Sequence, residues 1–205
     1  MANEPPQAKT LTPEMLLPRR CLREPIPAIF EAAHRLDRAA GAHLAGNAAL
    51  ARELITLADV PDVKAWTESL WGAARSNPDQ WRYIRLRPVP DSPPHLPKSE
   101  RVPVRMPNRA EQRDILAHWG WNCAFCGIPV ISAEVRKRMK VAYGSALRWE
   151  GTNATQHAAF ECMWLQFDHV LPHARGGTND IENVVVTCAP CNYGRMNTRS
   201  RRSVC

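Results

Sequence analysis

Two Cys-x-x-Cys pairs, far apart along the chain, restrict the possible folds of this sequence more than any other feature. One pair is Cys123 with Cys126, and the other is Cys188 with Cys191. Each short spacing lets both sulfur atoms of a pair point the same way, so two pairs can present four thiolates to one tetrahedral zinc ion. Residues 127 to 187 separate the pairs, which is much more chain than a simple zinc ribbon contains. A compact module must therefore be inserted between the two halves of the site.

Disulfide bonds or unrelated buried cysteines are the alternative interpretation of these four residues. The first residues show no basic start followed by an apolar core, so we expect no signal peptide. No run of about 20 apolar residues predicts a membrane span. We therefore expect a cytoplasmic protein, and because the cytoplasm is reducing, the zinc interpretation is favoured. Of the other cysteines, Cys162 is expected to be packed in the interior and Cys205 to be free, while Cys21 carries no prediction.

The sequence around the second cysteine pair predicts two strands followed by a helix. Residues 164–170 are dense in aromatic and apolar side chains, which predicts a buried strand. Pro172 and a Gly-Gly pair then end this strand and open a loop. The β-branched run at residues 183–187 predicts a second strand, and a helix is expected from residue 191 to about residue 198.

Several polar residues and glycines recur at defined spacings within this strand, loop, strand and helix. They are Asp168-His169, Pro172, Gly176-Gly177, Asn183 and Asn192. Together with the cysteine pairs they resemble the HNH endonuclease superfamily over about residues 109 to 199. The resemblance implies an α+β protein in which a zinc-stapled ββα-metal domain follows a small helical region. It also implies metal-dependent hydrolysis of phosphodiester bonds in a nucleic acid, which we expect to be DNA.

The resemblance also implies a role for each residue. His169 would be the general base, and a neutral imidazole can take a proton from water at neutral pH. Asp168 would bind the catalytic metal, and Asn183 would brace the loop. Asn192 would be the second metal ligand, in the place of the last histidine of the family pattern, which is a departure from that pattern. A carboxylate with an amide oxygen is a hard ligand set that suits Mg²⁺ or Mn²⁺.

Basic residues near this stretch are candidates for contact with phosphate groups. His173, Arg175 and Arg195 flank the Asp-His pair, although ordinary solvated side chains would fit these positions equally well. Lys and Arg number 27 against 20 Asp and Glu, which gives a net charge of +7 and agrees with a nucleic acid partner. Further basic clusters lie at residues 136–140 and 195–202. Charge alone does not identify a partner, so these clusters can also be plain surface.

Two other functions remain open from the sequence. A non-catalytic zinc module that binds nucleic acid or protein is the main alternative, although it would not need Asp168, His169 and Asn192. An RNase or toxin-like nuclease is the third possibility. No residue pattern predicts the oligomeric state, and no membrane partner is expected.

The rest of the chain is organised by its prolines and by helical periodicity. Residues 109–119 predict a helix that Asn108 caps with Glu111 three residues on. Short helices are also expected at 132–143 and 154–160. The predicted regions are an extended or disordered N-terminus at 1–27, a helical region at 28–87 with a break at Gly46-Asn47 and a second helix after Pro61, a stiff Pro-rich linker at 88–107, the nuclease domain at 108–199 and a basic tail at 200–205.

Overall fold

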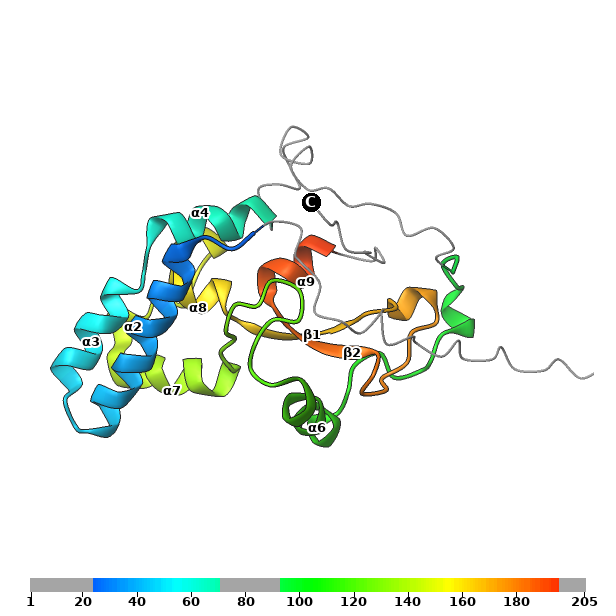
Figure 1. Cartoon of the computed structure of the whole chain (residues 1–205), viewed down its shortest axis with the longest axis horizontal. Helices are drawn as coiled ribbons and strands as arrows, with labels where there is room; N and C mark the ends of the chain where they lie inside the picture. The colour runs from blue at the N-terminus through cyan, green and yellow to red at the C-terminus, as the bar shows by residue number, and fades with distance from the viewer. Residues whose placement is uncertain (1–23, 71–92, 196–205) are drawn as a thin grey trace, which may run out of the picture.

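The computed structural model describes residues 24–70 and 93–195. Most of the predicted N-terminal extension, the end of the helical region, the start of the Pro-rich linker and the basic tail lie outside these residues. Within them, helices gather at one end of the molecule and a two-stranded sheet lies near the centre (Figure 1). No helix among the described residues is long and apolar enough to cross a membrane.

Within residues 24–70, the structure has three helices ahead of the Pro-rich stretch, and their positions agree with the predicted periodicity. Helix α2 (Pro27–Leu44) and helix α3 (Ala48–Leu57) form an antiparallel pair, and α4 (Pro61–Leu70) begins at a proline. The break between α2 and α3 falls at the predicted Gly46-Asn47, where Gly46 has a φ of +76°. Asn47 caps α3 by accepting a hydrogen bond from the Leu50 amide at 3.1 Å.

The segment between the two cysteine pairs folds against these helices. It contains α7 (Ala133–Tyr143), capped by Ser132, and α8 (Ala158–Cys162). The sequence predicted one helix at 154–160, but the chain there forms a 3₁₀ turn, η4 (Asn153–Thr155), before α8 begins. Between the two, the His157 ring bonds to the carbonyl oxygen of Ile55 on α3 at 2.9 Å. That bond fixes the side chain that caps α8, so α8 starts after residue 157.

Helix α4 is joined to α8 by a hydrophobic contact surface and a largely buried ion pair. Lys64 on α4 pairs with Glu161 on α8, whose side chain is 1% exposed. Burial raises the pKa of Glu161, and the Lys64 ammonium group opposes that rise. The buried apolar residues form one cluster that runs from α2 to the sheet. The division of the chain into separate domains stays a prediction.

The predicted strand, loop, strand and helix are present. Strand β1 (Leu165–His169) pairs antiparallel with β2 (Val184–Cys188), with Leu165 opposite Cys188 and His169 opposite Val184. Helix α9 (Ala189–Arg195) follows β2 at once. Helix α6 (Arg109–Trp119) lies on the other side of the strand pair from α9 (Figure 1). The predicted α+β fold with a ββα unit is therefore confirmed.

The two strands differ in burial, whereas the sequence predicted that the first would be buried. Every residue of β2 is buried, but Leu165 to Asp168 in β1 are only half-buried. The two strands differ in burial because different segments pack beside them. Strand β2 receives a backbone hydrogen bond from Ala124 to Val186 at 2.8 Å, so the first cysteine turn covers its far edge. Strand β1 instead contributes Asp168 and His169 to the lining of a cleft.

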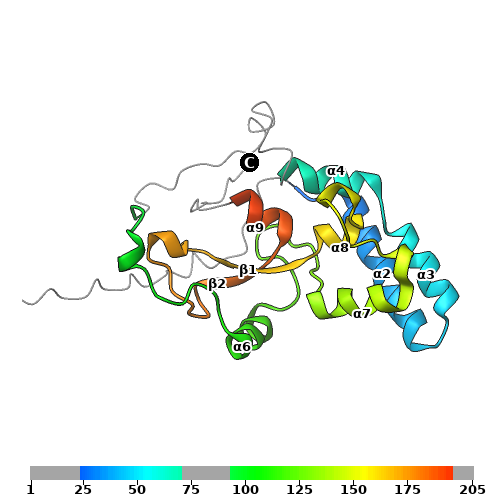
Figure 2. The ribbon, with the colours of Figure 1, turned by 180° about the vertical axis from the view of Figure 1, so that it is seen from behind.

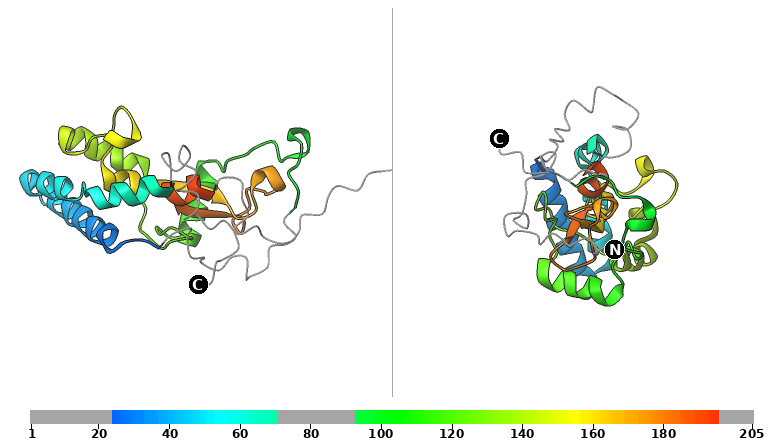
Figure 3. Two further views of the ribbon diagram at one scale, coloured as in Figure 1. Left: turned by 90° about the horizontal axis from the view of Figure 1, so that it is seen from above. Right: turned by 90° about the vertical axis from the view of Figure 1, so that its right-hand side faces the viewer.

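The Pro-rich segment, residues 93–107, lies along the loop that follows β1. It contains the 3₁₀ turn η2 (Lys98–Glu100) and leads into α6. The views from behind and from above both place it beside η5 (His173–Arg175) in that loop (Figures 2 and 3). Helix α6 starts with the predicted capping box: the Asn108 side chain accepts from the Glu111 amide at 3.1 Å, and Glu111 accepts from the Asn108 amide at 2.6 Å.

Candidate active site and zinc centre

The four cysteines of the two pairs meet at one point. The Sγ atoms of Cys123, Cys126, Cys188 and Cys191 all lie within 4.8 Å of one another. Those of Cys126 and Cys188 are 3.7 Å apart. A zinc ion with bonds of about 2.3 Å to tetrahedral sulfurs requires sulfur separations of about 3.8 Å. The cluster can therefore hold zinc as the sequence predicted, and no disulfide joins these cysteines.

Each half of the cluster is held by ordinary local structure. In the first turn, the Gly127 amide donates to the Cys123 carbonyl and the Cys123 amide to the Ile128 carbonyl, both at 2.8 Å. Gly127 has a φ of +78°, which favours glycine. In the second half, Cys188 ends β2 and Cys191 lies in the first turn of α9. A strand end and a helix start thus supply two ligands without a special loop.

The pKa values of two cysteine thiols bear on how the cluster would hold a cation. Burial raises the pKa of the Cys188 thiol to about 11. Burial also acts to raise the pKa of Cys123, but hydrogen bonds from the other three cysteines outweigh it and lower that pKa well below its ordinary value. The protein alone therefore stabilises negative charge at Cys123 and disfavours it at Cys188. A bound dication would stabilise the thiolate form of all four, because metal coordination deprotonates thiols.

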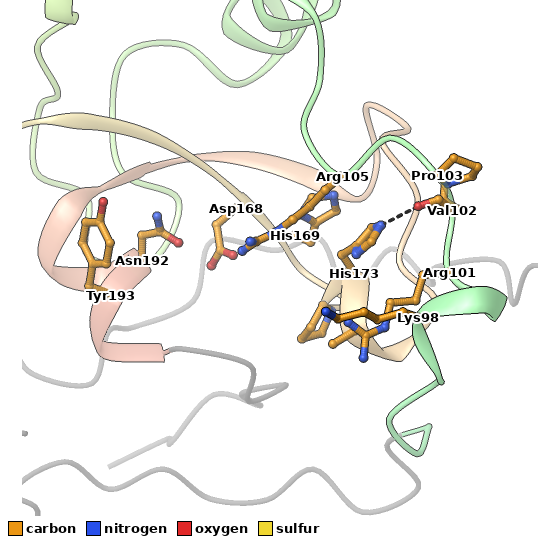
Figure 4. Close-up of a pocket in the computed structure, with 12 residues that line it drawn as sticks. Lys98, Arg101, Val102, Pro103, Arg105, Asp168, His169, His173, Asn192 and Tyr193 are labelled. Atoms are coloured by element: carbon orange, nitrogen blue, oxygen red, sulfur yellow. Dashed lines mark hydrogen bonds between the residues drawn. The ribbon is translucent and has the colours of Figure 1, made fainter.

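A cleft of about 640 Å³ is lined in part by Asn192 and Tyr193 of α9, the two residues that follow Cys191. Asp168 and His169 enter it from the end of β1, and Asn192 and Tyr193 enter it from the first turns of α9. Figure 4 shows Asp168 between His169 and Asn192. The remaining lining residues come from the loop after β1 and from the Pro-rich segment; they are Lys98, Arg101, Val102, Pro103, Arg105, Pro172, His173 and Ala174. The structure thus brings Asp168, His169 and Asn192 together in the cleft, whereas Asn183, the fourth residue expected in the active site, is not among the lining residues.

Asp168 and His169 are neighbours in sequence, and a regular strand would turn them to opposite faces. Both nevertheless line the cleft. His169 is the last residue of β1, and its side chain is almost fully buried, with 5% of the residue exposed. Beyond it, the Val170 amide still donates to the Asn183 carbonyl at 2.8 Å. Both side chains therefore reach one cleft where β1 ends.

The ring of His169 is oriented by Asn179, a residue that the sequence analysis did not single out. The Nε2 atom of His169 lies 3.0 Å from Oδ1 of Asn179. The Nδ2 atom of Asn179 donates to the carbonyl oxygen of Val104, also at 3.0 Å. Because that bond uses the amide nitrogen, the amide oxygen faces the histidine and must accept, so Nε2 carries the proton. In the neutral ring, Nδ1 is then the atom able to accept a proton.

Asn183 and the two glycines shape the loop between the strands. The Asn183 side chain accepts from the Leu171 amide at 2.8 Å and donates to the carbonyl oxygens of Leu171 at 3.3 Å and Thr178 at 2.8 Å. A Cβ atom at Gly177 would lie 1.9 Å from the Leu171 carbonyl oxygen, so only glycine fits there. Gly176 has a φ of +89° and ends η5. These contacts close the loop across its base.

The amide of Asn192 is directed by a second polar chain. Its Nδ2 atom donates to Oε1 of Gln166 on β1 at 3.4 Å, and Gln166 in turn donates to the Leu165 carbonyl at 2.8 Å. With the nitrogen used in this way, the amide oxygen turns toward Asp168, as Figure 4 shows. A carboxylate and an amide oxygen therefore face one another across the cleft. These are the donor atoms that a hard divalent ion takes, with water and substrate oxygens for its other positions.

The three residues predicted to contact nucleic acid have different surroundings. His173 lines the cleft, and its Nε2 atom donates to the Val102 carbonyl at 2.8 Å. Arg175 donates from Nη1 to the Pro93 carbonyl and is not among the residues that line the cleft. The side chain of Arg195 lies outside the described part of the structure. Their role in binding nucleic acid stays a prediction.

The basic cluster at residues 136–140 is not a uniform exposed surface. Arg136 is buried, and its guanidinium carbon lies 3.7 Å from the ring centre of Trp149 and 4.9 Å from that of Trp164. Burial lowers its pKa. Lys140 pairs with Glu150 at 2.6 Å. Two of its cations therefore serve the packing of the inserted module, and Lys137 and Arg138 alone stay exposed.

Comparison with known proteins identifies the region that holds these elements. Residues 160–202 match the family model described as HNH endonuclease. No curated protein and no solved structure matches the chain. The matched residues contain β1, the loop, β2, α9 and the second cysteine pair. The resemblance to HNH endonucleases that the sequence showed is therefore confirmed for this C-terminal segment.

Proposed function

We propose that this protein is a metal-dependent endonuclease that hydrolyses phosphodiester bonds of nucleic acid, with DNA as the expected substrate. One observation carries the proposal: a histidine whose ring contacts Asn179 lies beside a facing carboxylate and amide oxygen in one open cleft. This arrangement occupies the segment that matches the HNH family. A non-catalytic zinc module would have no use for the Asn179 contact that orients His169.

His169 is the general base in this proposal. Its Nε2–H group is held by Asn179, so Nδ1 takes the proton from the attacking water. A hard divalent ion such as Mg²⁺ or Mn²⁺, held by Asp168 and Asn192, would supply positive charge next to the scissile phosphate. Asn183 keeps the loop closed, which keeps Asn179 in reach of the histidine ring.

The cysteine cluster has a structural role in the same proposal, with zinc as the expected ion. Its four thiols form a complete ligand set, so no position is left for water or substrate. Cys191 and Asn192 are consecutive residues of α9. A zinc ion on Cys191 therefore fixes the backbone that presents Asn192 to the cleft.

The test is a cleavage assay on plasmid DNA, single-stranded DNA and RNA with the zinc-loaded full chain, with and without Mg²⁺ or Mn²⁺. We expect metal-dependent cleavage of DNA. His169→Ala should lower the rate by about 10²–10⁴-fold, because that is the usual contribution of a positioned general base. His34→Ala is the matched control, since this histidine is exposed on α2.

The outcomes separate the candidate functions. Cleavage of RNA alone would favour the RNase interpretation. Absence of cleavage with every substrate and ion, for a folded protein that still binds nucleic acid, would favour the binding module. Undiminished cleavage by His169→Ala would show that the base lies elsewhere.

A further inference from the structure

The Pro-rich segment gives the cleft most of its positive charge. Lys98, Arg101 and Arg105 on this segment line the cleft together with the Asp-His pair. Among the described residues that line it, Asp168 is the only acid. If Asp168 holds a divalent ion, its charge is already compensated. The cations of the Pro-rich segment then remain available for an anionic ligand.

The Pro-rich segment is attached to the loop after β1 at several points along its length. The Leu96 amide donates to the Ala174 carbonyl at 2.8 Å. His173 donates to Val102, and Asn179 donates to Val104. Its five prolines, at 93, 94, 97, 103 and 107, also restrict the backbone. Less conformational entropy is therefore lost when a ligand binds to it.

The three cations of the Pro-rich segment are not equivalent. Arg101 donates from Nε at 3.0 Å and from Nη2 at 2.8 Å to the Leu96 carbonyl, so it holds the turn at η2 together. Lys98 and Arg105 are exposed, and neither pairs with an acid among the described residues. Their side chains lie at either side of His173 in Figure 4. They are the two cations that an incoming anion can reach.

We propose that the Pro-rich segment is a nucleic-acid-binding wall of the cleft, on which Lys98 and Arg105 bind backbone phosphates of the strand that is cleaved. This inference rests on the proposed function and adds the surface that holds the substrate. Phosphate contacts of this kind position a strand without reading its sequence. The segment thus has two functions, because its Val104 carbonyl also holds the Asn179 side chain that orients His169.

The experiment measures binding rather than cleavage, in the zinc-loaded full chain carrying His169→Ala. Fluorescence anisotropy with a short labelled DNA duplex and a labelled single strand is recorded over a series of salt concentrations. Lys98→Ala with Arg105→Ala should weaken binding roughly tenfold or more and reduce the slope of log affinity against log salt by about 1.4–1.8. The double variant Lys98→Arg with Arg105→Lys keeps a positive charge at both positions and should therefore keep most of the affinity of the parent.

The matched control is Lys137→Ala with Arg138→Ala, which removes the same charge from exposed positions on α7. A smaller loss of affinity in this control than in the variant of the Pro-rich segment supports the inference. Equal losses would overturn it and leave the proposed function standing, because net charge alone would then explain binding. Failure of the His169→Ala parent to bind either DNA would overturn this inference and, in the proposed function, DNA as the expected substrate. Because Lys98 and Arg105 are exposed and unpaired with described residues, the melting temperature should not change.

Discussion

The cysteine cluster and the proposed catalytic cleft are neighbours on α9, but they contain different kinds of ligand. Cys191 turns a sulfur into the buried cluster, and Asn192, the next residue, turns an amide into the open cleft. The cluster has four ligands of one kind and excludes water. The cleft brings together the Asp168 carboxylate, the Asn192 amide oxygen and the His169 ring, and space remains beside these three groups.

In the proposed function, this difference separates a site that stabilises the fold from a site that performs the reaction. A complete thiolate set satisfies a zinc ion and ties distant chain segments together. An incomplete oxygen set must be completed by water or by a phosphate oxygen of the substrate. Because the two sites share α9, damage to the cluster should disturb the cleft, whereas changes in the cleft should leave the cluster intact.

The largest expected effect comes from a change in the cluster. Cys188→Ser should abolish zinc binding and unfold the C-terminal region, because structural zinc contributes on the order of 10 kcal/mol to folding. Zinc content and thermal melting measure this. Cys162→Ala is the control: Cys162 is buried outside the cluster, so the variant should keep its zinc and lose about 1 kcal/mol of stability. Native protein whose four thiols react freely and at once would contradict the zinc assignment.

A smaller effect, confined to the cleft, is expected from Asn179→Ala. Without this residue the His169 ring loses the bond that fixes its protonated nitrogen. The single-turnover rate at saturating substrate should fall roughly 10–100-fold, which is part of the contribution of the base itself. Zinc content and melting temperature should stay unchanged. The neighbouring Thr178→Ala, whose hydroxyl bonds only to Asp180 at 2.6 Å among the described residues, is the control. An equal loss in both variants would mean that the loop as a whole, rather than Asn179, matters.

The smallest effect is a change of metal preference. Asn192→His replaces a hard oxygen donor with imidazole, so activity should shift from Mg²⁺ or Mn²⁺ toward Ni²⁺ or Co²⁺. Cleavage assays over this series of ions, with zinc content as a reference, measure the shift. Asp168→Ala, a much larger change, is the reference variant and should fail with every ion, because Asp168 is the only charged ligand of the pair. Identical ion profiles for the original chain and Asn192→His would remove Asn192 from the metal site.

The elements around the site could be predicted because their signals are local. Each signal involves residues that are close together in the sequence. They are the Cys-x-x-Cys spacing, the β-branched run before Cys188 and the capping pair of Asn108 and Glu111. The Asp-His pair was identifiable because Gly176-Gly177, Asn183 and Asn192 accompany it at spacings that resemble the HNH endonuclease pattern. Signals between residues that are close in the sequence can be recognised without a structure.

The contribution of Asn179 had no comparable signal. It is one polar residue in a loop rich in polar residues and glycine, and its partners are His169, ten positions earlier, and Val104, on a different segment. The contact of the Pro-rich segment with the cleft could not be predicted from the sequence either. Proline content predicts a stiff backbone but not where the segment lies in the fold. The only available clue was three basic residues, Lys98, Arg101 and Arg105, at spacings of three and four among the prolines.

The sequence by itself indicated which cysteines can bind zinc, and its resemblance to HNH endonucleases singled out His169 as the expected base and Asp168 as the expected metal ligand, because these motif residues lie close together in the sequence. Only the tertiary structure decided that α4 packs on α8, that Arg136 is enclosed by two tryptophans and that the Pro-rich segment lines the cleft. Those facts depend on which surfaces bury each other, and residues far apart in sequence become neighbours only when the chain closes on a common core.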